Sequence, residues 1–319
     1  MGVGRPRYER GLAEVGEGLW AWLQPDGGWG WSNAGLIETG DGAVLVDTLF
    51  DLKLTREMLE AMRARIPAAA LIGTLVNTHA NGDHCYGNSL VAGAEVIASR
   101  ASADEMAEVP PAMLAGMMAA APNMGELGAY LTRIFGGFRF DGIGLTRPTR
   151  TFEGSLSFEA GGRRIDLIEV GPAHTAGDTI VHLPDARTIY TGDILFAWST
   201  PIMWTGPVAN WIAACDLIAD LKVETIVPGH GPVCGLDAVA ALRAYLCYIR
   251  DEAWKRFDAG LGPEEAARDI ALSDWSNWGD AERIAVNVNT LYREFAHDHA
   301  PPNIADLFAR MARLARDRK

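Results

Sequence analysis

A group of metal-binding residue types placed directly after an apolar run constrains the fold of this chain more than any other feature. The run Leu71–Val76 has the length and composition of a buried strand. It leads into His79-Ala-Asn81-Gly-Asp83-His84, so two imidazoles, a carboxylate and an amide share one short turn. Imidazoles and carboxylates are the nitrogen and oxygen ligands that Zn²⁺ takes in proteins. The turn therefore predicts a metal site at the carboxyl end of a strand.

Further residues of the same types stand in turns that follow other predicted strands. These are His174 after Arg164–Val170, Asp193 after Thr188–Tyr190, and His230 after Glu224–Val227. The chain has 7 histidines, and most of them fall in these turns. Because the loops at the carboxyl ends of strands converge in α/β proteins, we expect these side chains to meet at one site.

The pattern along the chain predicts an α/β protein. Residues 12–50 show the short apolar runs and Gly/Asp turns of a β-meander, and helical spacing follows over residues 52–65. Residues 102–150 are rich in Met, Ala and Gly and predict a helical insertion, either a lid over a pocket or a plain pair of packing helices. A second β region then begins with a strand predicted over Thr151–Phe158.

Beyond about residue 237 every segment shows helical spacing. We therefore predict a catalytic domain over residues 1–236, which includes the insertion at 102–150. A C-terminal helical extension over residues 237–319 completes the chain.

The ordered set of motifs resembles the metallo-β-lactamase superfamily. A variant of that family's H-x-H-x-D-H turn lies at residues 79–84, and its G-x-x-H-T-x-G loop is matched at residues 171–177. Its G-D turn is matched at residues 192–193, and its P-G-H-G turn at residues 228–231. Each motif alone is weakly specific, whereas the four in this order are highly specific. The resemblance implies a four-layer αβ/βα sandwich with metals at one edge, to which the C-terminal helical extension is added.

The resemblance also implies two groups of metal ligands bridged by one carboxylate. The first group is His79, residue 81 and His174, the second is Asp83, His84 and His230, and the bridge is Asp193. Asp83 and Asp193 are the expected catalytic residues, because they would position the metal and its water. Asp47, at the end of Gly-Ala-Val-Leu-Val-Asp, matches an acidic residue of the family and is expected to orient a ligand or a loop N–H.

Zinc is the cofactor that the resemblance implies, with one or two ions per chain. A bound zinc ion lowers the pKa of its water toward neutrality and supplies hydroxide as a nucleophile. The predicted function is therefore hydrolysis of an ester, lactone, amide or related bond in a small molecule. Two alternatives are an iron-dependent redox enzyme of the same superfamily, similar to a sulfur dioxygenase, and a non-catalytic module that binds a metal or a ligand.

Asn81 departs from the family pattern, which has histidine at this position. An amide oxygen is a poorer zinc ligand than an imidazole. Three interpretations follow: the protein works with one zinc ion in the second group, it binds a second and weaker metal through Asn81, or Asn81 contacts the substrate or the water instead. Some zinc β-lactamases also carry asparagine in this turn, but there it replaces the first histidine.

Aromatic residues gather near two of the motifs. Trp29 and Trp31 lie in an early hairpin, and Phe196, Trp198, Met203 and Trp204 follow the bridging Asp193. These side chains predict a pocket for an apolar or aromatic substrate. The alternative is that they pack the C-terminal helices onto the sandwich.

Composition excludes several kinds of partner. The net charge of −13 disfavours nucleic acid and anionic membranes, because both call for a basic surface. We expect a cytoplasmic protein, since no stretch has the length of a membrane-spanning helix and no secretory signal is recognisable. The 4 cysteines lack the spacing of a disulfide framework. The C-terminal helices and their tryptophans suggest a homodimer.

Overall fold

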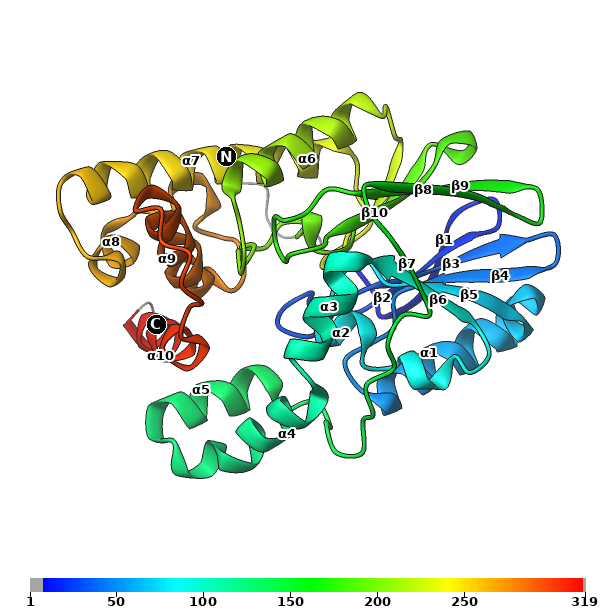
Figure 1. Cartoon of the computed structure of the whole chain (residues 1–319), viewed down its shortest axis with the longest axis horizontal. Coiled ribbons are helices and arrows are strands. Elements are labelled where there is room, and N and C mark those ends of the chain that lie inside the picture. Colours follow the sequence, from blue (N-terminus) through cyan, green and yellow to red (C-terminus); the bar gives the residue numbers. More distant parts are fainter. Residues whose placement is uncertain (1–7, 318–319) are drawn as a thin grey trace.

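The computed structural model describes residues 8–317 and contains two β-sheets packed face to face, with helices on their outer sides (Figure 1). The first sheet is formed by β1 (Gly11–Gly16), β2 (Leu19–Leu23), β3 (Ala34–Thr39), β4 (Gly42–Val46), β5 (Ile72–Val76), β6 (Glu95–Ser99) and β7 (Arg150–Phe152), in sequence order. Strands β1 to β4 pair antiparallel, which confirms the meander predicted over residues 12–50. Strands β4 to β7 pair parallel.

The second sheet has the strand order β12-β11-β10-β9-β8. Its strands are β8 (Ser155–Ala160), β9 (Arg163–Glu169), β10 (Thr179–Leu183), β11 (Thr188–Tyr190) and β12 (Thr225–Val227). Strands β11 and β12 are parallel, and the other neighbours are antiparallel.

Apolar side chains alternate between the two faces of the first sheet. In β4, Val44 and Val46 belong to the core between the sheets, whereas Leu45 belongs to the core under the helices. The second sheet contributes Leu167 and Val181 to the core between the sheets. Because successive residues of a strand face opposite sides, a strand buried on both faces reads as a continuous apolar run.

Helices cover the outer faces and build the C-terminal region (Figure 1). They are α1 (Leu52–Arg65), α2 (Gly82–Cys85), α3 (Arg100–Glu108), α4 (Pro111–Ala120), α5 (Gly125–Phe135), α6 (Val208–Asp220), α7 (Leu236–Asp258), α8 (Pro263–Asp269), α9 (Ile284–Phe295) and α10 (Ile304–Asp317). The predicted αβ/βα sandwich with a C-terminal helical region is confirmed. Within residues 8–317, no helix combines the length and the apolar character needed to cross a bilayer.

The predicted strand Thr151–Phe158 is wrong, because the chain changes sheets inside it. Strand β7 pairs with β6 in the first sheet, and β8 pairs with β9 in the second. Gly154 lies between them with φ of +68°, a conformation that favours glycine. A short apolar run that crosses a turn looks like one strand in the sequence, because its hydrophobic periodicity is the same on both sides of the turn.

The helical insertion predicted over residues 102–150 contains α3, α4 and α5, and residues 136–149 form no helix or strand. Helix α5 lies beside α10 of the C-terminal region (Figure 1). Tyr130 donates its hydroxyl to Glu282 at 3.2 Å, and Arg133 pairs with the same carboxylate at 2.9 Å. Arg316 pairs with Glu126 at 3.0 Å. The insertion is therefore joined to the C-terminal helices by buried and surface contacts.

Candidate metal centre

The turns that carry the predicted ligands meet at one edge of the sandwich. His79 and His84 follow β5, His174 follows β9, Asp193 follows β11, and His230 follows β12. All of them are buried. The turn after β5 is fixed by its backbone, because Asn77 Nδ2 and the Thr48 N–H both donate to the carbonyl of His84, at 3.0 and 2.9 Å.

Asp193 lies between two groups of side chains. Its Oδ2 lies 3.7 Å from Nε2 of His79 and 3.3 Å from Nε2 of His174. Its Oδ1 lies 3.1 Å from Nε2 of His84, and its Oδ2 lies 3.4 Å from Nε2 of His230. One carboxylate therefore faces four imidazoles, which is the arrangement expected of the predicted bridging residue.

Asp83 completes the second group. Its Oδ2 lies 3.3 Å from Nε2 of His230 and 4.0 Å from Nε2 of His84. The possible ligand atoms of Asp83, His84 and His230 all lie within 4.8 Å of one another, as do those of His79, His84 and Asp193. The spacing of these donor atoms fits the coordination sphere of a small cation.

Asn81 faces His174 across a short distance. Nδ1 of His174 lies 2.6 Å from the carbonyl of Ile202, and a carbonyl can only accept, so Nδ1 carries the proton. In the neutral ring Nε2 then carries a lone pair, and it lies 2.7 Å from Oδ1 of Asn81. In this orientation of the amide two acceptors face each other, and a cation bound by both would remove their repulsion. With the amide rotated by half a turn, Asn81 would instead donate to His174.

Asp47 holds the turn and the ring of His84. Its Oδ1 accepts the N–H of Thr78 at 2.7 Å, and its Oδ2 accepts the Thr78 hydroxyl at 2.7 Å. Nδ1 of His84 lies 2.9 Å from Oδ2 of Asp47. Because an ionised carboxylate only accepts, Nδ1 of His84 carries a proton and donates it. Nε2 is thereby directed toward Asp193.

The buried charges of this site shift the pKa values of one another. Burial alone would lower the pKa of His84 and of His230, but the carboxylates around them outweigh it. The pKa of His84 is raised well above its usual value, and that of His230 to about 9. Burial and the charge of His84 hold the pKa of His79 well below its usual value. Burial raises the pKa of Asp193, yet the neighbouring histidines bring it well below the usual range.

Several possible metal-ligand atoms at the centre lack a hydrogen-bond partner in the described part of the chain, although Nε2 of His84 and Oδ1 of Asp193 face each other as an ion pair at 3.1 Å. Among residues 8–317, Nε2 of His79, Nε2 of His84 and Oδ1 of Asp193 are buried and make no hydrogen bond. Buried polar atoms without partners are costly and are rare in folded proteins. The residues present therefore fit a bound metal, which would take these atoms as ligands.

The residues predicted to line the substrate pocket differ in their burial. Trp29, Trp31, Trp198 and Trp204 are half-buried, so part of each ring remains accessible. Phe196 and Met203 are buried, with at most 1% of their surface exposed, and their place in the predicted substrate pocket stays a prediction. Phe196 stacks on the ring of His230, with centroids 5.1 Å apart and planes 4° apart.

Packing also accounts for part of the tryptophan cluster. Trp29 contacts Phe135 of α5 and Phe308 of α10, with ring centroids 5.7 and 5.9 Å apart. Trp204 contacts Phe308 at 6.0 Å. Helix α5 of the insertion and α10 of the C-terminal region thus both pack against Trp29. Such packing is what the alternative interpretation of these tryptophans predicted.

Residues that the sequence did not single out support the same loops. Asn33 donates through Nδ2 to the carbonyls of Pro228 and Gly231, at 2.9 and 2.8 Å, and so holds the turn of His230. Nothing in the sequence distinguishes Asn33 from other loop residues. Arg283 is fully buried, and its guanidinium lies 4.5 Å from the ring centre of Trp29.

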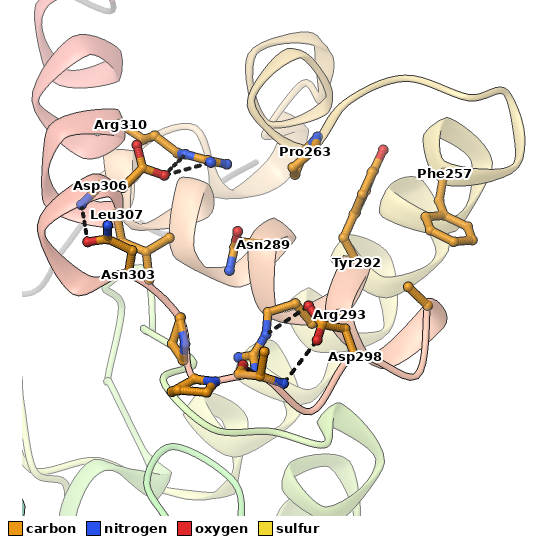
Figure 2. Close-up of a pocket in the computed structure, with 14 residues that line it drawn as sticks. Phe257, Pro263, Asn289, Tyr292, Arg293, Asp298, Asn303, Asp306, Leu307 and Arg310 are labelled. Carbon is orange, nitrogen blue, oxygen red and sulfur yellow. Dashed lines mark hydrogen bonds and ion pairs between the residues drawn. The ribbon is translucent and has the colours of Figure 1, made fainter.

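A groove of about 430 Å³ lies apart from the metal centre, in the C-terminal helical region (Figure 2). Figure 2 shows the ion pairs Arg310–Asp306 and Arg293–Asp298 along it. None of the residues that line it belongs to the turns of the metal centre.

Comparison with known proteins places these features in a family. The chain matches the family model described as the metallo-beta-lactamase superfamily over residues 27–230, which contain all the predicted ligands. The alpha subunit of 2,4-dinitroanisole O-demethylase from Nocardioides sp. is 25% identical over 201 residues, which cover 61% of this chain and 51% of that subunit. The hydroxyacylglutathione hydrolase of Brucella ovis is 33% identical over 82 residues, 25% of this chain and 32% of the hydrolase. The chain thus spans about half or less of the matched relatives.

Solved structures show the same fold. An inverting sec-alkylsulfatase from Pseudomonas sp. aligns with a TM-score of 0.67 at 18% identity, covering 93% of this chain and 52% of the alkylsulfatase. A metallo-beta-lactamase from Pontibacter korlensis aligns with a TM-score of 0.57 at 20% identity, covering 75% of this chain and 99% of the lactamase. The alkylsulfatase likeness therefore covers more of the chain than the lactamase likeness does.

Proposed function

Because the chain belongs to the metallo-beta-lactamase superfamily, we propose that it is a zinc-dependent hydrolase of small molecules. The observation that carries this proposal is a set of buried nitrogen and oxygen atoms that face one another and make no hydrogen bond within residues 8–317: Nε2 of His79, Nε2 of His84 and Oδ1 of Asp193. The side chains of Asn81 and His174, whose Oδ1 and Nε2 lie 2.7 Å apart, would add two more ligands. A metal ion would satisfy such a set, because it takes nitrogen and oxygen atoms of this kind as ligands.

The ligands divide into a stronger and a weaker group. Asp83, His84 and His230 would hold one zinc ion, with Asp193 shared between the groups. His79, Asn81 and His174 would hold a second ion more weakly, because an amide oxygen is a poorer zinc ligand than an imidazole. When bound, zinc supplies Lewis acidity and a water acidified toward neutral pH.

The surrounding residues orient the ligands. Asp47 fixes the proton of His84 on Nδ1, and the carbonyl of Ile202 fixes that of His174 on Nδ1. Nε2 is therefore the atom of each ring that faces the centre, and it would be the ligand atom when a metal takes the place of any proton there. Phe196 stacks on His230 and covers one face of that ring. Asp83 and Asp193 carry the negative charge that holds a cation there.

The proposed substrate is small and apolar or aromatic, with an ester, lactone, amide or related bond. The half-buried rings of Trp29, Trp31, Trp198 and Trp204 support this proposal, because they give an apolar wall that excludes water. The relatives' names include a 2,4-dinitroanisole O-demethylase and a sec-alkylsulfatase. Aryl methyl ethers and alkyl sulfate esters therefore belong among the bonds to be tested.

We also propose that the protein is cytoplasmic and forms a homodimer. Cys85, Cys215, Cys234 and Cys247 are free thiols, which is usual in a reducing compartment. Trp254 on α7 is 49% exposed, a large apolar side chain that a second copy of the chain would cover.

The function is tested by removing metal with a chelator and restoring it with zinc or with iron under otherwise identical conditions. A panel of aryl esters, lactones, amides, alkyl sulfates and aryl methyl ethers reports turnover. We expect hydrolysis that is lost with the metal and restored by zinc. Turnover that requires iron and consumes oxygen would instead support the redox alternative. Metal binding without turnover of any compound would support the alternative of a non-catalytic module that binds a metal or a ligand.

A further inference from the structure

Side chains of α9 hold the loop segment 200–203 by its backbone. Asn287 accepts the N–H of Met203 through Oδ1 at 2.8 Å and donates through Nδ2 to the carbonyl of Pro201 at 3.0 Å. Thr290 donates its hydroxyl to the carbonyl of Met203 at 2.7 Å. Both side chains are at least 98% buried, so water does not compete for these bonds.

The turn that precedes α9 adds another contact to the same segment. Arg283 donates through Nη1 to the carbonyl of Thr200 at 2.9 Å. The C-terminal region thereby takes three of the four carbonyls of segment 200–203. The remaining one, that of Ile202, lies 2.6 Å from Nδ1 of His174.

We infer that α9 positions the metal ligand His174 through segment 200–203. The inference rests on the proposed function, in which His174 binds metal. The carbonyl of Ile202 keeps the proton of His174 on Nδ1, which leaves Nε2 as the ligand atom. Because the neighbouring carbonyls are held by α9, the Ile202 carbonyl cannot turn away from His174 without breaking bonds on both sides of it.

The position of α9 makes this role specific to the C-terminal region. Asn287 and Thr290 are three residues apart and lie on one face of α9, and Arg283 in the turn before the helix stands four residues ahead of Asn287. Asn287 also donates to the hydroxyl of Tyr245 on α7 at 3.1 Å, which fixes its amide. A region that could be a mere addition to the sandwich therefore contributes to the geometry of the metal centre.

The test measures zinc affinity by competition with a chelator, and the tautomer of His174 by ¹⁵N resonances of the metal-free protein. Asn287→Ala removes two bonds to the segment, and Thr290→Val removes one bond at nearly constant volume. Loss of a group that orients a ligand typically costs about 10-fold to 100-fold in metal affinity. We expect a loss of about 10-fold or more for Asn287→Ala, a smaller loss for Thr290→Val, and a growing population of the Nε2–H form of His174 in both.

Leu314→Ala is the matched control. Leu314 is buried in α10, so its truncation weakens the same helical region, and its apolar side chain makes no hydrogen bond to segment 200–203. We expect a lower unfolding temperature with zinc affinity and tautomer unchanged. If Thr290→Val folds and both of its readouts equal those of wild type, the inference is overturned.

The two proposals fail in different ways. Wild-type protein that binds no zinc would overturn the proposed function, and the tautomer in the metal-free variants would still decide whether α9 positions His174. Wild-type protein that binds zinc, together with variants that bind it equally well and keep the Nδ1–H form, would overturn the inference alone.

Discussion

Replacing Asp47 with asparagine isolates the orientation of one metal ligand. The side chain keeps its size, and asparagine tolerates the φ of +62° at this position as well as aspartate does. One oxygen becomes an NH₂ group, however. If the amide oxygen accepts the Thr78 N–H, the NH₂ faces Nδ1 of His84, where Oδ2 accepted a proton before. His84 must then carry its proton on Nε2, which removes the lone pair that points toward Asp193.

The size of the effect follows from this change of tautomer. Losing a group that orients a metal ligand costs about 10-fold to 100-fold in affinity. This range corresponds to about 1.4 to 2.8 kcal/mol of binding free energy. With the amide in the opposite orientation the NH₂ faces the Thr78 N–H, so two donors oppose each other and the fold is destabilised instead.

Chelator competition with zinc at fixed pH measures the prediction, and Asp51→Asn is the control. Asp51 is as buried as Asp47 and accepts two backbone N–H groups, from Leu54 at 2.7 Å and Arg139 at 3.0 Å, but it touches no histidine. We expect Asp51→Asn to lower the free energy of unfolding and to leave zinc affinity unchanged. The reasoning is refuted if Asp47→Asn binds zinc as tightly as wild type, or if Asp51→Asn weakens binding equally.

Two further predictions concern the backbone near Asp193 and the pH dependence of stability. A Cβ added at Gly229 would lie 2.0 Å from Oδ1 of Asp193, so Gly229→Ala should displace that carboxylate and lower the zinc content measured by elemental analysis. In the control Gly73→Ala the added Cβ meets no atom within 4 Å, so the zinc content should not change. Equal zinc contents in the two variants would contradict the bridging position of Asp193. Burial raises the pKa of Glu294 from 4.5 to about 7, against the hydrogen bond from Val208. The folded state then holds a proton that the unfolded state loses near pH 4.5, so this group's contribution to stability is lost as the pH rises from about 4.5 through 7. Urea unfolding across this window should show wild type losing stability relative to Glu294→Gln, and parallel curves would contradict the assignment.

The sequence predicts the parts of the fold that depend on local chemistry. Helix α1 begins after Asp51, whose carboxylate caps it, and ends before Pro67, so both bounds are visible in the sequence. The gathering of His79, His174 and His230 follows from a general rule, because each stands after a strand of an α/β sandwich. These features need no knowledge of how distant segments pack.

Features that depend on distant packing were not predictable in this way. The burial of Phe196 and Met203 depends on which helix covers them, and the tryptophan-rich segment reads the same whether it lines a pocket or a core. One residue of α9 gives a signal of this role in the sequence. Asn287 is a polar residue within the apolar run Ile284–Val288, which indicates a buried hydrogen bond without naming its partner.

The zinc content of wild type and Asn81→His, measured by elemental analysis after dialysis at low free zinc, tests the metal centre most directly. With Asn81 as the weak ligand, we expect about one zinc ion per chain in wild type, a second at higher free zinc, and about two in Asn81→His at low free zinc. Equal contents in both proteins would show that residue 81 does not limit the first group. If neither folded protein binds any metal, the metal centre is refuted and the enzyme proposal falls with it.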